Sequence, residues 1–471
     1  MMKYKIDIEI FYALFATILI GVVGWDTGLF WDNVLFVHKM SVPLLQNGIL
    51  DWGSIPLESD PGHPPFIATY MSLIWSVFGR SIHVAHIALY PFIFLFVFEI
   101  LSIAFFVFKD RILALVLTTL VIADPTVLTS LMYIGTEVFV LTFSSIAIHG
   151  IITRNVWRKT IGLMLLGICS LRGMMLCAGL FLWDAIATVS VKRHHIKTVC
   201  SWHFLYPYII ASLPAISFVI WRMVFKGWII GNPIAPWGDA MGFENLSDFL
   251  YNFARNIVVF LHRIIDFGRI IIWIIALLLL WFNRTNIKSN YLVKIIILFV
   301  IFSCSLIVLA SLFIKNPMGH SYFMLIYIGV LFLVVELARQ IKWKKIIYII
   351  TFSALVLGNF IVYPDHISQG WSASLASLSY WRLRKELLLY IDDQGIPLEK
   401  VLFDFPFGNC SDDIDLNGDK RVYAKNIKNA SYFVASNVCN FSDEILSQIN
   451  NYSPIFHIQK RGVYITLYKI P

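Results

Sequence analysis

Asp32 and the stretch "DPGHPPF" at residues 60–66 carry the side chains whose types and spacing first suggest chemistry. An aspartate carboxylate is a suitable general base for activating a hydroxyl group. Asp32 also precedes a run of apolar residues at helical spacing, 34–45, which ends at Gly48, and aspartate is a favoured N-cap in front of a helix. Residue type and spacing leave both roles open, and Asp26 is the alternative acid in the same segment.

The stretch "DPGHPPF" predicts a rigid turn. Its three prolines each fix φ, Gly62 permits a sharp reversal, and the proline after His63 favours an extended backbone there. We expect this turn to return the loop to the second membrane span. Asp60 and His63 either hydrogen-bond within the turn or bind a substrate.

The amino-acid composition indicates the class of protein in which these residues are placed. Of 471 residues, 58% are hydrophobic and only 14% are charged, and the mean hydropathy is +0.75. This composition excludes an ordinary soluble globular domain and predicts an integral, polytopic α-helical membrane protein. The net charge of +8 is spread over short loops between apolar runs, a pattern that favours the positive-inside rule over a nucleic-acid-binding patch.

The apolar runs predict about eleven transmembrane helices, because each run could cross the hydrocarbon core as a helix. A short pair around "SLRG" at 170–173 could instead form one longer span. If the N-terminus is cytoplasmic, the basic loops lie inside, and loops 25–83 and 223–268 and the tail after 363 lie outside. The predicted spans are 7–24, 84–108, 112–131, 134–152, 159–171, 173–190, 203–222, 269–283, 293–314, 321–338 and 345–363.

The tail predicts a second, extracytoplasmic domain, so the chain divides into a transmembrane part, 1–363, and a small α/β domain, 364–471. Residues 376–395 have helical spacing, and "FSDEILSQINN" reads as a capped helix. "KVLFDFPF", "SYFVASN", "SPIFHIQ" and "GVYITLYK" read as strands. "DDIDLNGDKRVY" at 412–423 fits either an Asn-Gly turn or an incomplete calcium loop. Cys410 and Cys439 could form a disulfide bond outside the cytoplasm.

The first external loop resembles a known family. "FWDN", "LLQNG" and "HPPFIATYMSLIWSVFG" are similar to segments of the bacterial relatives of the protein O-mannosyltransferases and of the lipid A aminoarabinose transferases, which are GT-C glycosyltransferases. The family commonly has an Asp-Glu pair where this chain has Asp32-Asn33. The resemblance implies a GT-C-like fold, a polyprenyl-phosphate-linked sugar donor, an active site at the outer face of the membrane, and Asp32 as the catalytic base.

The resemblance is looser further along the chain, where it implies additional substrate-binding residues. Glu137 in "YIGTEVFVL" stands where the family often has an acid, although an acid within a span is also explained by a structural ion pair. Arg172 in "LRGMM" would hold the donor phosphate, or alternatively cap a helix or reach to the membrane surface. His320 and Tyr322 belong to "GHSYFMLIYIGVLFL", which is similar to a late segment of the family.

No cofactor is assigned with certainty. His63, His320 and Asp60 could together hold a divalent metal if they meet outside the membrane, although three scattered residues are a weak metal pattern.

Together these observations predict an enzyme of the cell (inner) membrane. It would move a sugar from a polyprenyl phosphate to a hydroxyl of a lipid, glycan or protein acceptor. A transporter or flippase is the alternative, but transporters concentrate ionisable groups at mid-membrane and often show an internal repeat, whereas the distinctive motifs here lie in external loops. A scaffold that only presents the C-terminal domain would leave the first loop unexplained. The sugar and the acceptor depend on the shape of the pocket, which the sequence does not reveal.

Overall fold

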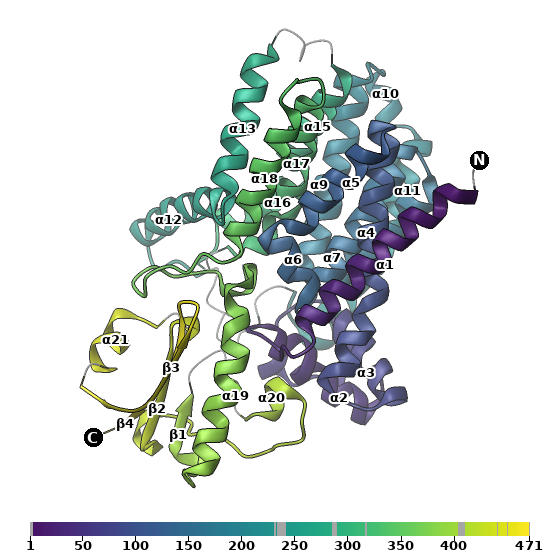
Figure 1. Ribbon diagram of the computed structural model, residues 1–471. Coiled ribbons are helices and arrows are strands. Elements are labelled where there is room, and N and C mark those ends of the chain that lie inside the picture. Colours follow the sequence, from purple (N-terminus) through teal and green to yellow (C-terminus); the bar gives the residue numbers. More distant parts are fainter. Residues whose placement is uncertain are drawn as a thin grey trace.

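The computed structural model describes residues 3–229, 232, 242–284, 290–315, 318–403, 410–439, 441–449 and 451–470. A bundle of helices forms most of the molecule, and a small sheet flanked by helices lies at one end of it (Figure 1). The bundle comprises α1 (Lys3–Gly24), α4 (Ile82–Phe108), α5 (Arg111–Ala123), α6 (Pro125–Met132), α7 (Glu137–Thr153), α8 (Val156–Cys169), α9 (Leu171–Ile186), α11 (Trp202–Lys226), α13 (Arg269–Phe282), α15 (Tyr291–Phe302), α16 (Ser305–Leu312), α17 (Met324–Ala338) and α18 (Lys344–Gly358).

Helices occupy all eleven positions at which the sequence predicts a span. In the part of the chain that the structure describes, five helical segments are long and apolar enough to cross a membrane, or up to seven if each of two bent helix pairs counts as one span. A multi-pass helical membrane protein is therefore confirmed, and the count of eleven spans stays a prediction. The two helices predicted around "SLRG" are present as α8 and α9, which meet at Ser170 and pack against each other.

The predicted span 112–131 is not one continuous helix. It bends by 74° between α5 and α6. Asp124 ends α5 and caps α6, since its Oδ1 accepts hydrogen bonds from the backbone N–H groups of Thr126 and Val127, and Pro125 occupies the first position of α6. Asp124 is also paired with Arg269 at 2.7 Å, so the bend is held by a buried ion pair that the sequence pattern did not indicate.

The first loop forms a helix where one is predicted and a second helix where none is. The run 34–45 is a π-helical segment, η1 (Val34–Lys39), that continues as α2 (Met40–Asn47) and ends at Gly48, whose φ of 138° is unfavourable for other residues. "DPGHPPF" does not lead directly into the second span, as predicted, but into α3 (Phe66–Phe78). Gly79 and the N-cap Ser81 then separate α3 from α4.

The loop 223–268 contains a helix that the sequence analysis missed, α12 (Leu246–Ile265). Its polar Asn252 and Asn256 are buried, whereas Val258 and Leu261 are more than half exposed. An outward apolar face is typical of a helix that lies in the membrane interface. α12 lies at the side of the bundle and is steeply inclined to α13, because the chain bends by 82° between the two helices (Figure 1).

The C-terminal domain has the four predicted strands within its described residues. The sheet order is β1-β2-β4-β3, with β1 (Val401–Phe403) parallel to β2 (Tyr432–Ser436), and with β4 (Val463–Lys469) antiparallel to both β2 and β3 (Ser453–Lys460). Helix α19 (Leu378–Asp393) packs on one face of the sheet, and α21 (Asp443–Ile449) is the predicted capped helix. No disulfide bond joins Cys410 and Cys439.

This domain is attached to the first loop through α20 (Asp412–Asp415), which lies against η1. Arg80 donates hydrogen bonds to both carboxylate oxygens of Asp412, at 3.1 and 2.8 Å, and His38 lies 3.3 Å from Asp413. Asp415, the third acid of α20, pairs with Arg384 at 2.6 Å. Each acid of α20 thus has a cationic or histidine partner, so this segment is an interdomain contact rather than a calcium loop. The first loop and the C-terminal domain therefore lie at the same end of the bundle (Figure 1).

Candidate active site

A cavity of about 340 Å³ lies at the end of the bundle that carries the first loop. The segments that line it include the residues just before η1, the end of α6, the N-terminal ends of α7 and α9, the turn before α17, and residues 368–372. Five of the eight predicted site residues line it, namely Asp32, His63, Glu137, Arg172 and Tyr322. Sequence positions up to 290 residues apart thus meet around one space.

The Asp32 side chain does not cap the helix that follows it. Asn33 occupies the N-cap position and makes no side-chain cap bond, and within the described residues the Asp32 carboxylate accepts no hydrogen bond. Its neighbour Trp31 has a φ of 51°, which is rare for a bulky residue and is typical of strained backbone at functional sites. The N-cap reading of Asp32 is therefore wrong, and its carboxylate remains available to the cavity.

The surroundings of Asp32 alter its proton affinity. Burial raises the pKa of the Asp32 carboxyl above the usual range of an aspartate, because the charged form loses solvation. The positive charge of Arg172 opposes this shift, and the negative charge of Glu137 adds to it. A carboxylate with a raised pKa is a stronger base than one in free solution, which suits proton abstraction from a hydroxyl.

Arg172 and Glu137 form an ion pair that begins two neighbouring helices. Arg172 Nη2 donates to Glu137 Oε1 at 2.8 Å, and Nη1 donates to the Ser321 hydroxyl at 3.0 Å. The guanidinium also lies 4.7 Å from the centre of the Tyr322 ring, a cation–π contact. Arg172 therefore does not cap a helix with its side chain. Its orientation in the cavity is fixed by these contacts.

Gly135 lets the loop before η1 approach this ion pair. A Cβ atom at Gly135 would lie 2.7 Å from Asn33 Oδ1 and 2.8 Å from Glu137 Oε2, which is closer than real Cβ contacts. A side chain here would displace the two residues between which it would lie. The glycine therefore leaves room for the ends of the Asn33 and Glu137 side chains.

His63 supports the start of α9. Its Nδ1 accepts a hydrogen bond of 3.2 Å from the backbone N–H of Leu171, the residue before Arg172. Burial and the nearby guanidinium groups of Arg172 and Arg222 lower the pKa of His63 to about 3, so the ring is neutral. Because Nδ1 is the acceptor, the proton of this neutral ring is on Nε2, and His63 can donate one hydrogen bond into the cavity.

Three predicted site residues lie outside the cavity. Asp26 is exposed and lies 3.8 Å from Lys385, and Asp60 is buried in an ion pair of 2.6 Å with Arg222. His320 is buried, and its Nε2 lies 2.7 Å from Asp266 Oδ2. The predicted metal trio is therefore held in separate contacts, and no cluster of three metal-ligating side chains occurs among the described residues.

The cavity contains a second guanidinium group that the sequence pattern did not indicate. Arg263 extends from α12, and its side chain is 13% exposed. Its Nη1 has no hydrogen-bond partner within the described residues, although Asp266 lies 4.0 Å away. The helical spacing of apolar residues between 246 and 265 could have revealed α12, but nothing in the pattern singles out Arg263. Gln369 and Trp371, from the segment after α18, also line the cavity.

No protein-family model matches this chain, and no curated protein matches it by sequence. Among solved structures, the chain is similar to the crystal structure of ArnT from Cupriavidus metallidurans bound to undecaprenyl phosphate. The TM-score is 0.51 at 13% sequence identity, and the match covers 97% of each chain. ArnT is a lipid A aminoarabinose transferase of the GT-C class, so the GT-C-like fold implied by the first loop is confirmed across the whole chain.

Proposed function

We propose that this protein is a glycosyltransferase that moves a sugar from a polyprenyl-phosphate-linked donor to an acceptor hydroxyl at the outer face of the cytoplasmic membrane. The observation that carries this proposal is the Asp32 carboxylate, which accepts no hydrogen bond within the described residues and shares a cavity with Arg172. The ArnT structure holds undecaprenyl phosphate, and the fold similarity supports a lipid phosphate as the leaving group here.

The reaction follows from the charges of the cavity. The acceptor oxygen attacks the anomeric carbon of the sugar as the bond from that carbon to the phosphate oxygen breaks. Asp32 takes the acceptor's proton, and the polyprenyl phosphate leaves with the bonding electrons. A phosphate is a good leaving group, so one carboxylate is sufficient, unlike the two carboxylates of glycoside hydrolases.

The two guanidinium groups have different roles in this proposal. Arg172 is held in place by Glu137 and offers its remaining donor capacity to the departing phosphate. Arg263, whose Nη1 has no hydrogen-bond partner within the described residues, is the more available donor. These positive charges are already in place where negative charge develops on the phosphate. They lower the activation free energy, because the protein does not have to rearrange during the reaction.

The proposal is tested with the purified full-length protein and a panel of polyprenyl-phosphate sugars. We expect release of free polyprenyl phosphate only when an acceptor is present, with the sugar recovered on that acceptor. Mass spectrometry of glycolipids and glycoproteins from cells with and without the protein identifies the acceptor. Identical glycan profiles, together with no turnover of any donor, would contradict the proposal.

A further inference from the structure

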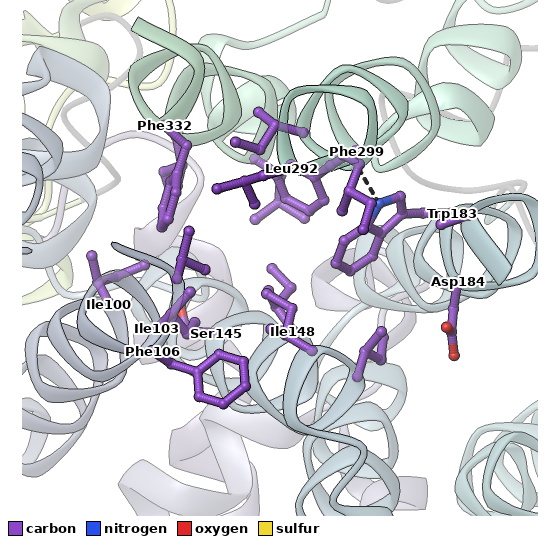
Figure 2. A pocket seen from close by; sticks show the side chains of 18 of the residues that line it. Ile100, Ile103, Phe106, Ser145, Ile148, Trp183, Asp184, Leu292, Phe299 and Phe332 are labelled. Atoms are coloured by element: carbon purple, nitrogen blue, oxygen red, sulfur yellow. Dashed lines mark hydrogen bonds between the residues drawn. The ribbon is translucent and has the colours of Figure 1, made fainter. Parts of the chain in front are cut away.

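A second cavity, also of about 340 Å³, lies between α4, α7, α9, α15 and α17. Its lining is almost entirely apolar, and Figure 2 shows side chains such as Ile103, Ile148 and Phe299 directed into the space. Ser145 is a polar exception, but its hydroxyl donates to Leu141 O at 2.8 Å and needs no ligand. The interior therefore suits a hydrocarbon chain rather than a polar molecule.

The rim of this cavity is basic. Lys192 and the half-exposed Tyr291 line it. Arg154 is close enough to interact electrostatically with both, and it forms no ion pair within the described residues. Lys109 lies 4.0 Å from the ring centre of Phe106, another exposed lining residue.

The acids near the rim offset the charge of these cations only in part. Asp184 is shared between Lys159, at 3.7 Å, and Lys192, at 4.0 Å, and it also accepts a hydrogen bond from Tyr208. Asp110 follows Lys109 but accepts hydrogen bonds from the first N–H groups of α5. The rim thus keeps a net positive charge beside an apolar space.

We propose that this cavity binds an anionic phospholipid, with one acyl chain between the helices and the headgroup phosphate at Lys192 and Arg154. Basic pockets between transmembrane helices bind anionic lipid headgroups in this way. The phosphate of a polyprenyl donor bound at Arg172 is not the headgroup at this rim. Arg172 and Lys192 lie at opposite ends of one continuous helical segment of 21 residues, Leu171–Val191, which is about 30 Å long. A single phosphate cannot reach both, so this inference does not depend on the catalytic proposal.

Native mass spectrometry of the full-length protein in detergent tests the proposal with three probes: dioleoylphosphatidylglycerol, dioleoylphosphatidylcholine and undecaprenyl phosphate. We expect phosphatidylglycerol to bind more tightly than phosphatidylcholine. In the double variant Arg154→Gln/Lys192→Gln this preference should fall by about tenfold, because each basic residue near the headgroup adds to anionic lipid binding. The matched control is Lys342→Gln/Lys345→Gln, which removes two charges after α17 that do not line the cavity and should keep the preference.

A second variant, Ile148→Trp, fills the cavity and should abolish phosphatidylglycerol binding while undecaprenyl phosphate binding persists. Equal affinity for the two phospholipids in the unmodified protein would overturn the proposal. Undiminished phosphatidylglycerol binding in the double variant would also overturn it. Loss of undecaprenyl phosphate binding in Ile148→Trp would overturn it as well. The catalytic variant Asp32→Asn should bind phosphatidylglycerol normally, so failure of the lipid site and failure of the proposed function are distinguishable.

Discussion

Arg172 and Glu137 are joined by a hydrogen bond of 2.8 Å although they are 35 residues apart, and they stand at the starts of α9 and α7. This pair forms one wall of the cavity that Asp32 faces from the first loop. The guanidinium is thus oriented by the protein before any substrate arrives, which is the arrangement that electrostatic stabilisation of a leaving group requires.

Removing either guanidinium should weaken binding of the donor. For Arg172→Ala and for Arg263→Ala we expect a loss of about 1.5 to 3 kcal/mol, the size of a hydrogen bond to a charged group. Lysine should restore only part of it at position 172, because lysine offers a point charge instead of a planar fork. Isothermal titration with a donor analogue measures the effect. Unchanged affinity in both alanine variants would remove the guanidinium groups from donor recognition.

The pH dependence of transfer should report the charges around Asp32. As the pH falls, Asp32 becomes protonated and can no longer act as a base, so the transfer activity falls. Because the pKa of Asp32 is raised, we expect this loss at a pH above the value of about 3.9 for a free aspartate. Glu137→Gln removes a charge that raises this pKa and should move the acidic limb to lower pH. Arg172→Gln removes a positive charge that lowers the pKa of Asp32, so this variant should lose activity at a higher pH than the unmodified protein. Profiles of kcat/KM against pH measure both shifts, and shifts in the same direction would contradict the assignment.

Gly135→Ala should impair transfer more than it impairs folding. The added methyl group would push aside the side chains of Asn33 and Glu137. A small displacement of a reacting or positioning group can lower the reaction rate by about 100-fold. Gly167→Ala is the matched control, because its Cβ would make only ordinary contacts, at 3.6 Å or more, outside the cavity. Transfer rates and thermal unfolding of the two variants provide the comparison. Equal activities would mean that the site tolerates the displacement.

The contact between α20 and the first loop should matter for activity, because it fixes η1 immediately after Asp32. Asp412→Asn leaves Arg80 without its bidentate partner and should lower both the transfer rate and the melting temperature. Asp392→Asn is the control, since Asp392 pairs with Arg421 on the exposed surface of the same domain, where such pairs contribute little. If the two variants behave alike, the C-terminal domain does not position the catalytic loop.

Much of the fold follows from local patterns. Apolar runs of helical length predict the bundle helices, and alternating residues predict the C-terminal strands, because both depend on burial within one element. The break at Asp124 and the helix α12 were missed. The break is capped locally by Asp124 before Pro125, but its buried partner Arg269 is 145 residues away, and the residues of α12 were assigned to a loop.

The candidate site was predicted only in part, because tertiary packing decides which polar side chains meet. Asp32, His63, Glu137, Arg172 and Tyr322 do meet in one cavity. Asp60 and His320 carry equally suitable side chains, yet each is paired with a distant residue, Arg222 or Asp266. Partners of this kind are chosen by tertiary packing, so residue type alone cannot separate a buried structural pair from a site residue.

The role of Asp32 as the base is tested directly by the single-turnover rate of sugar transfer by Asp32→Asn, measured beside Asp26→Asn. Asparagine has nearly the same shape but cannot take the proton, so we expect a loss of at least about 100-fold at position 32. The exposed Asp26 should tolerate the change. Because ionised Asp32 is disfavoured by burial, Asp32→Asn should unfold at an equal or higher temperature at neutral pH. A well-folded, inactive Asp32→Asn protein is the predicted result, and near-normal transfer by that variant would contradict the account.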